Sequence, residues 1–160
     1  MLLSLRKFFI VVLGFGVSIL AAESANAQTR GTTADGRSFA TGGVTADELS
    51  DLAAEKSQYE LWVTTAAKGS GAFLSDAQVK ITDTRKKHVV LDTMMIGPWL
   101  FVDLAPGAYT IEATFNGQTQ KRTTRVGAGD RHQAILYFDV PADLSPDWVS
   151  PFANSPYAAN

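Results

Sequence analysis

Apolar and polar residues alternate most clearly over residues 107–115. Tyr109, Ile111, Ala113 and Phe115 occupy every second position, and a threonine or glutamate stands between each pair. A period of two places neighbouring side chains on opposite faces of a β-strand. The stretch therefore predicts a strand with one buried face and one face in water.

Turn signals flank this strand, with Pro106-Gly107 before it and Asn116-Gly117 after it. Asn-Gly favours a type I′ hairpin, because both central residues of that turn need positive φ. The same alternation between turn residues predicts seven strands, at residues 59–66, 77–84, 88–92, 98–104, 107–115, 118–126 and 131–140. Short strands at this spacing indicate an antiparallel β-sandwich.

The centre of the core is predicted from the large apolar residues on either side of the Pro-Gly turn. These are Trp99, Phe101 and Leu104 before it, and Tyr109, Ile111 and Phe115 after it. Strand 118–126 is polar on both faces apart from Val126, which is typical of an edge strand.

A helical pattern precedes the strands, at residues 44–57. Thr45 and Glu48 have the spacing of a capping box. The apolar stripe that follows is narrow, so we expect one short helix that packs lightly at the edge of the domain. Residues 28–43 are rich in Gly, Thr, Ser and Ala and predict a flexible leader.

Residues 1–27 have the three parts of an export signal. Two basic residues precede an apolar run over residues 8–22, and Ala25-Asn26-Ala27 is a small-x-small cleavage pattern. The run is shorter than the about 20 apolar residues that a membrane span needs, which disfavours an uncleaved anchor. We expect cleavage after Ala27 and a periplasmic or secreted mature chain.

Composition narrows the function classes. Without Arg6, Lys7 and Glu23, the mature chain carries 12 basic and 15 acidic residues, a net charge of −3. This charge is too small to favour nucleic acid or strong membrane binding. The chain has no cysteine, so it offers no disulfide, thiolate metal site or lipid-modified cysteine.

No residue pattern supports a catalytic, cofactor-binding or metal-binding assignment. His88 and His132 lack the spacing of metal ligands and are expected at the surface. Aspartates at strand ends fit turn caps; calcium binding is an alternative, although no spaced Asp-x-Asp loop supports it. These aspartates are Asp83, Asp92, Asp103 and Asp130.

Basic residues cluster in the loop after residue 84, in the polar strand 118–126 and at the start of the predicted strand 131–140. They form either a basic binding patch or the charges with which edge strands resist sheet-to-sheet association, and we favour the latter. They are Arg85, Lys86, Lys87, Lys121, Arg122, Arg125 and Arg131.

Residues 141–160 form a weak repeat in which proline recurs every five residues. Trp148, Phe152 and Tyr157 stand between the prolines without a strand or helix period. The segment is either a disordered or loosely docked end, or a tail that packs its aromatic side chains on this domain or on a partner.

The motif Leu104-x-Pro106-Gly107-x-Tyr109-x-Ile111 resembles the signature of carboxypeptidase regulatory-like domains, which have a transthyretin-like (prealbumin-like) sandwich. Trp99 and Phe101 match the aromatic residues that precede the motif in that family, and the resemblance covers about residues 58–140. It implies an all-β, seven-stranded antiparallel transthyretin-like sandwich after one short helix. Most members are non-catalytic modules of exported proteins, so the motif is silent on a ligand.

Two relatives with known chemistry fit poorly. Transthyretin-like hydroxyisourate hydrolases end in Tyr-Arg-Gly-Ser, whereas this chain has Tyr157 followed by Ala-Ala-Asn. Collagen-adhesin repeats form a Lys–Asn isopeptide bond with the help of a buried acid. This chain has Ala113 at the acid's place and no asparagine in residues 131–140.

The function expected from the sequence is an exported, non-catalytic binding or structural module of the bacterial envelope. Its partner would be an envelope protein or a polysaccharide, without nucleic acid, cofactor or stable membrane insertion after signal cleavage. The alternative is an accessory subunit of an envelope hydrolase or chaperone-like system, with the chemistry on another chain.

Overall fold

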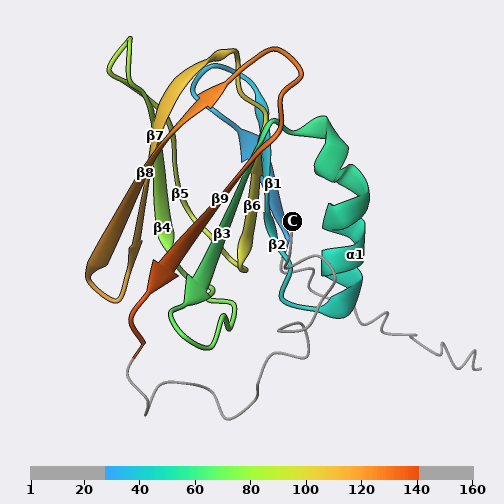
Figure 1. Ribbon diagram of the computed structural model, residues 1–160. Coiled ribbons are helices and arrows are strands. Elements are labelled where there is room, and N and C mark those ends of the chain that lie inside the picture. The colour runs from blue at the N-terminus through green and yellow to red at the C-terminus, as the bar shows by residue number, and fades with distance from the viewer. Residues whose placement is uncertain (1–27, 141–160) are drawn as a thin grey trace, which may run out of the picture.

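A computed structural model describes residues 28–140, which form two β-sheets packed face to face, with one α-helix against the outside of the first (Figure 1). The five-stranded sheet has the order β1 (Thr29–Thr32), β2 (Ser38–Gly42), β6 (Trp99–Val102), β3 (Leu61–Ala67) and β9 (His132–Phe138). The four-stranded sheet has the order β5 (His88–Met94), β4 (Gln78–Asp83), β7 (Gly107–Phe115) and β8 (Gln118–Val126). The helical elements are α1 (Ala46–Glu55) and a 3-10 turn, Lys56–Gln58.

These elements confirm an all-β sandwich with one short helix. The predicted antiparallel pairing is wrong for one pair, because β3 and β9 run parallel, whereas all other neighbouring strands are antiparallel. Each of the seven predicted strands is present, and the bounds of β7 and β8 agree residue for residue with the prediction. Asn116 and Gly117 both have positive φ, 46° and 75°, as a type I′ hairpin requires.

The flexible leader predicted for residues 28–43 is wrong, because this segment forms the β1–β2 hairpin and brings the described residues to nine strands. β2 pairs with β6, and Ala40 is fully buried opposite Phe101. A Cβ built on Gly97 would lie 2.2 Å from the carbonyl oxygen of Gly42. Glycine is therefore needed at position 97, where the chain passes close to the end of β2.

The main core fills the space between the two sheets. Leu104, Tyr109 and Ile111 lie in it as predicted, and Phe115 packs at its margin with its ring 5.7 Å from that of Phe138. Other fully buried members come from both sheets; they include Leu61, Val63, Val79, Ile81, Leu100, Val102 and Phe138.

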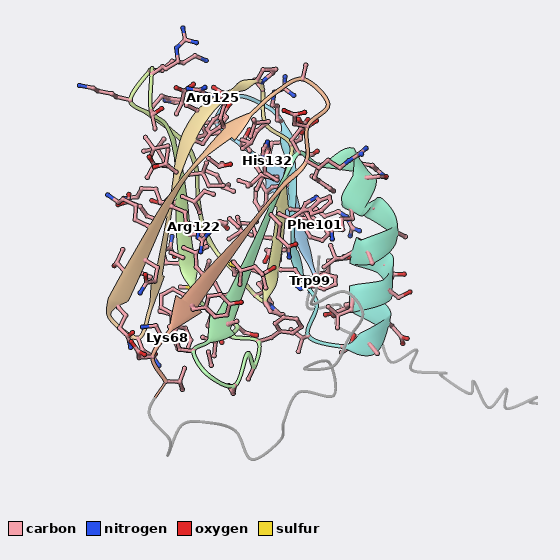
Figure 2. The ribbon with its side chains drawn as sticks, in the orientation of Figure 1. Lys68, Trp99, Phe101, Arg122, Arg125 and His132 are labelled. Carbon is pink, nitrogen blue, oxygen red and sulfur yellow. The ribbon has the colours of Figure 1, made fainter. Side chains whose placement is uncertain are left out.

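Trp99 and Phe101 were predicted for this core, but they belong to a second cluster on the outer face of the five-stranded sheet. Figure 2 shows both side chains between the sheet and α1. Leu100 and Val102 point into the main core instead. Both faces of β6 are buried, so its apolar run carries no alternation from which to choose the inward face.

The helix covers this second cluster. The amide of Glu48 donates to Thr45 Oγ1 at 3.3 Å, and the Glu48 carboxylate accepts from the Thr45 amide at 3.4 Å, which confirms the capping box. Leu52 is fully buried with Phe101 and Tyr59. The helix therefore closes a core of its own, rather than packing lightly at the domain edge.

The Pro106-Gly107 turn carries the chain from β6 in one sheet to β7 in the other. The Tyr109 hydroxyl donates to the Ala105 carbonyl at 2.8 Å and fastens this crossing. Gly107 lies against the Tyr109 ring, where an added Cβ would come within 3.2 Å. The turn motif thus specifies a packed corner.

The signal (residues 1–27) and the tail residues Trp148, Phe152 and Tyr157 lie outside the described part of the chain. Within residues 28–140, no helix has the length and apolar character of a membrane span.

Candidate functional site

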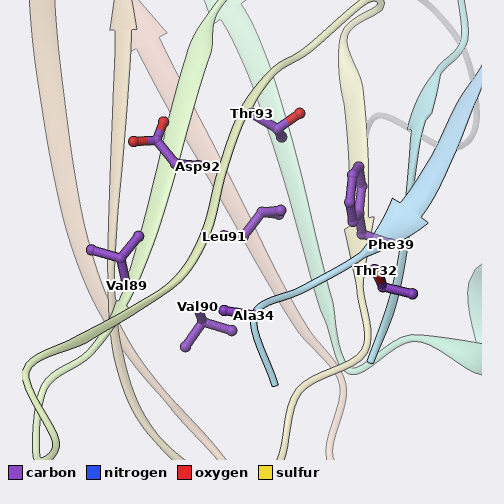
Figure 3. A pocket seen from close by; sticks show the side chains of 8 residues that line it. All are labelled: Thr32, Ala34, Phe39, Val89, Val90, Leu91, Asp92 and Thr93. Atoms are coloured by element: carbon purple, nitrogen blue, oxygen red, sulfur yellow. The ribbon is translucent and has the colours of Figure 1, made fainter. Parts of the chain in front are cut away.

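A groove runs between the outer edges of the two sheets, where the β1–β2 hairpin faces β5 (Figure 3). Its volume is about 420 Å³. We call it the edge groove. It is lined by Thr32, Ala34, Phe39, Val89, Val90, Leu91, Asp92 and Thr93.

The floor of the edge groove is apolar because β5 is irregular at this point. The register of β4 against β5 shifts between Ile81 and Thr82, and consecutive residues Val90 and Leu91 are both buried. Leu91 points toward Phe39 on the hairpin, as Figure 3 shows. The groove therefore has buried apolar side chains at its base and threonine and aspartate at its rim.

β5 forms an edge of its sheet. The Ala34 amide donates to the Val90 carbonyl at 2.8 Å, but no described strand pairs along this side of β5. Val89 and Met94 stand near its two ends, 41% and 50% exposed. An unpaired strand edge beside apolar side chains is the arrangement to which an extended peptide adds as a further strand.

A second apolar surface lies on the outer face of the five-stranded sheet. We call it the aromatic face and define it by Trp62, Phe73, Trp99, Ile135 and Tyr137. The first four are partly buried and Tyr137 is 42% exposed. The ring centroids of Phe73 and Trp99 lie 6.4 Å apart. Since α1 packs on the β2 side of this sheet, the strands β3 and β9 carry the open half of the face (Figure 1).

Titratable groups with shifted pKa values lie outside the edge groove. Burial raises the pKa of Tyr59, which packs in the second cluster, and of Tyr109, which packs in the main core. Desolvation lowers the pKa of Lys56, whose Nζ lies 3.9 Å from the centre of the Trp62 ring. These shifts follow from packing, because burial disfavours the charged forms of tyrosine and lysine.

Asp83 caps the turn between β4 and β5, as its place at a strand end predicted. Its Oδ1 accepts from the backbone amides of Arg85 and Lys86, at 2.9 and 3.0 Å. The amide of Lys86 is the main cause that holds the pKa of Asp83 below its ordinary value of 3.8. A carboxylate that accepts amide hydrogen bonds is stabilised in its charged form.

Asp83 should therefore make the fold sensitive to acid. Folding lowers the pKa of Asp83, so its contribution to stability is fully present at a pH above the pKa that it has in the unfolded chain. That contribution is lost as the pH falls through the pKa that Asp83 has in the folded chain. We expect the melting temperature of Asp83→Asn to change less than that of the wild type between neutral pH and pH about 3. Asp51→Asn, on the exposed surface of α1, is the control. Equal acid sensitivity of Asp83→Asn and the wild type would contradict the role of this turn.

The two histidines lie apart in the fold. His88 is exposed, with its Nε2 3.5 Å from Asp35 Oδ1, in agreement with the surface position predicted. The surface position predicted for His132 is wrong. His132 lies on the same inward face of β9 as Ala134. Its Nε2 is buried without a hydrogen-bond partner among the described residues.

The strand-end aspartates remain separate. Asp103 Oδ1 lies 2.6 Å from Arg37 Nη1, and Asp92 accepts a hydrogen bond from the side-chain Nε2 of Gln78. Among residues 28–140, no group of three or more His, Asp or Glu side chains is arranged to hold a metal ion.

Three of the basic residues have local partners. Lys121 pairs with Glu112 at 2.6 Å, and Lys86 lies 3.9 Å from Asp83. Arg131 donates to the Ser57 carbonyl. β8 lies at the edge of its sheet as predicted, and Arg122 and Arg125 are exposed on it. This arrangement agrees with charged protection of an edge strand.

No protein-family model matches the chain, and no curated protein matches it. The resemblance to carboxypeptidase regulatory-like domains stays a prediction from the motif around Tyr109. Functional inference therefore starts from the edge groove and the aromatic face.

Proposed function

We propose that the chain is exported, cleaved after Ala27, and acts in the periplasm or outside the cell as a non-catalytic binding module of the bacterial envelope. The transthyretin-like family assignment belongs to this proposal. It is supported by the motif from Leu104 to Ile111, and by the two-sheet sandwich in which the motif forms a corner.

The edge groove is the observation that carries the proposal. It combines the side of β5 along which no strand of residues 28–140 pairs with a base formed by Phe39, Val90 and Leu91. Unpaired backbone groups give affinity for any extended chain, and a pocket beside them selects the side chain that enters it. The partner is an extended segment of an envelope protein that presents an apolar residue to the groove.

This chemistry favours a protein partner over a polysaccharide. A peptide can supply alternating amides and carbonyls along β5, in the spacing that a strand edge needs. The rim residues Thr32, Asp92 and Thr93 would then contact polar side chains of the partner.

The aromatic face favours a related alternative, in which the chain is an accessory subunit of an envelope hydrolase or chaperone-like system. Tyr137 and the edge groove lie on opposite edges of the sandwich, because β9 and β1 are the two outer strands of one sheet. A module with two apolar surfaces can hold two chains at once.

A site-specific crosslink tests the binding function. A photoreactive amino acid at Val89 should capture one envelope protein in living cells, through an extended segment that mass spectrometry identifies. The same amino acid at Thr123, which is exposed on the edge strand β8, is the matched control. Absence of an adduct at Val89, or the same products from both positions, would contradict the proposal.

The aromatic tail should mediate contact without being needed for folding. A chain that ends before Pro141 should melt only a few degrees lower, because both cores are formed by residues 28–140. Recovery of the partner should fall, since Trp148, Phe152 and Tyr157 are costly to leave in water. Melting curves and quantitative recovery measure the two effects.

Full-length chain with alanine at Trp148, Phe152 and Tyr157 is the control, because it keeps the length and the prolines. Loss of the folded state on truncation would show that the tail is part of the core. Unchanged recovery would show that it makes no contact with a partner.

A further inference from the structure

Gln28 precedes β1 and has an unusual side-chain environment. Its Oε1 accepts a hydrogen bond from Arg30 Nη1 at 2.7 Å, whereas its Nε2 is buried without a partner among the described residues. A buried amide donor without an acceptor is unfavourable and calls for a physical explanation. One half of this side chain is satisfied, and the other half is not.

Arg30 is held from a second direction. Its Nη2 lies 2.8 Å from Glu55 Oε1, at the end of α1. The guanidinium therefore connects the start of the first strand to the helix, with one nitrogen on Glu55 and one on the carbonyl oxygen of the Gln28 amide.

The expected cleavage after Ala27 makes Gln28 the first residue of the mature chain. We propose that the newly freed α-amine of Gln28 attacks its own side-chain amide and converts the residue into pyroglutamate. This inference rests on the export that is part of the proposed function. It assigns a modification site at the first residue of the mature chain.

The reaction balances within one residue. A bond forms between the α-nitrogen and Cδ, the bond from Cδ to Nε2 breaks, and a proton passes from the α-nitrogen to the departing nitrogen. The products are a five-membered lactam and one molecule of ammonia. No oxidant, reductant or other reactant takes part.

Arg30 contacts the atom on which charge develops. As the amine adds to Cδ, negative charge accumulates on Oε1, the acceptor of the Arg30 hydrogen bond. A donor aimed at a developing oxyanion lowers the barrier to its formation. The departing atom is Nε2, the buried donor for which residues 28–140 provide no acceptor.

The product suits the same surroundings. The lactam keeps the carbonyl oxygen that Arg30 binds and loses the unsatisfied nitrogen. Thr29 remains paired with Thr41, so β1 keeps its place in the sheet. The mature chain then starts with a neutral ring, which an aminopeptidase that needs a free α-amine cannot remove.

Mass spectrometry of the chain exported from its full-length precursor tests the inference. The chymotryptic peptide that covers residues 28–39 should weigh one ammonia less than its sequence requires, and it should not react with an amine-labelling reagent. A peptide that starts at Gln28 and carries the label would overturn the modification and leave the export intact. A mature chain that starts elsewhere would overturn the cleavage on which the modification depends.

Two variants provide the controls. Gln28→Ala should be exported and keep a free, labelled α-amine, because alanine has no amide to attack. Arg30→Ala should lose ammonia several-fold more slowly in a time course after export. Equal rates for Arg30→Ala and the wild type would overturn the part assigned to Arg30.

Discussion

Replacing Tyr109 with alanine is expected to lower the free energy of unfolding by about 3–5 kcal/mol, as other large aromatic truncations in cores do. Tyr109 is 2% exposed, and its ring fills the main core at the corner between β6 and β7. The substitution leaves a cavity and also removes the hydroxyl that donates to the Ala105 carbonyl. Denaturant unfolding followed by circular dichroism measures the loss.

Two other variants separate these causes. Tyr109→Phe keeps the ring and removes only the hydrogen bond, so it should cost about 1 kcal/mol. Glu112→Ala changes the outer face of the same strand and should stay within about 0.5 kcal/mol. Equal losses for Tyr109→Ala and Glu112→Ala would contradict the inward and outward faces assigned to β7.

Phe101→Ala should also cost about 3–5 kcal/mol, although Phe101 lies outside the main core. Its side chain is 2% exposed and packs with Tyr59 and Leu52 under α1, its ring centroid 5.8 Å from that of Tyr59. The helix is too short to be stable without this packing. Its amides should therefore exchange hydrogen faster in this variant, beyond the change due to global stability.

Val44→Ala is the matched control, because Val44 precedes the same helix and is half exposed. It should leave both stability and exchange in α1 nearly unchanged. If Phe101→Ala destabilised the sandwich without faster exchange in α1, the helix would not depend on this cluster.

Strands and caps were predictable where the pattern and the local chemistry agree. β7 alternates because one face is buried, and Asn116-Gly117 provides the positive φ values that the next turn needs. The helix start followed from Thr45 and Glu48, whose hydrogen bonds depend only on residues close in sequence.

Two parts of the fold could not be predicted in this way. Trp99 and Phe101 lie in a strand buried on both faces, so the pattern does not distinguish the sandwich core from the layer under α1. β2 was hidden because residues 28–43 are rich in glycine and small polar residues, a composition that is typical of linkers.

The edge groove was missed for a different reason. It joins Phe39 to Val90 and Leu91, which are far apart in the sequence and meet only through the arrangement of the two sheets. The consecutive apolar residues Val89, Val90 and Leu91, and the isolated Phe39, were the available signals. Neither indicates that two strand edges lie side by side.

Hydrogen exchange along β5 is the most direct test of the binding function. It should be measured on the purified mature chain, alone and with a synthetic peptide of the segment captured through Val89. Amides of β5 should exchange more slowly with the peptide present, because a new strand pairs with this edge. Amides of β8, the opposite edge of the same sheet, should be unchanged. Protection in β8 or α1 with unchanged exchange in β5 would contradict the assignment of the edge groove as the binding site.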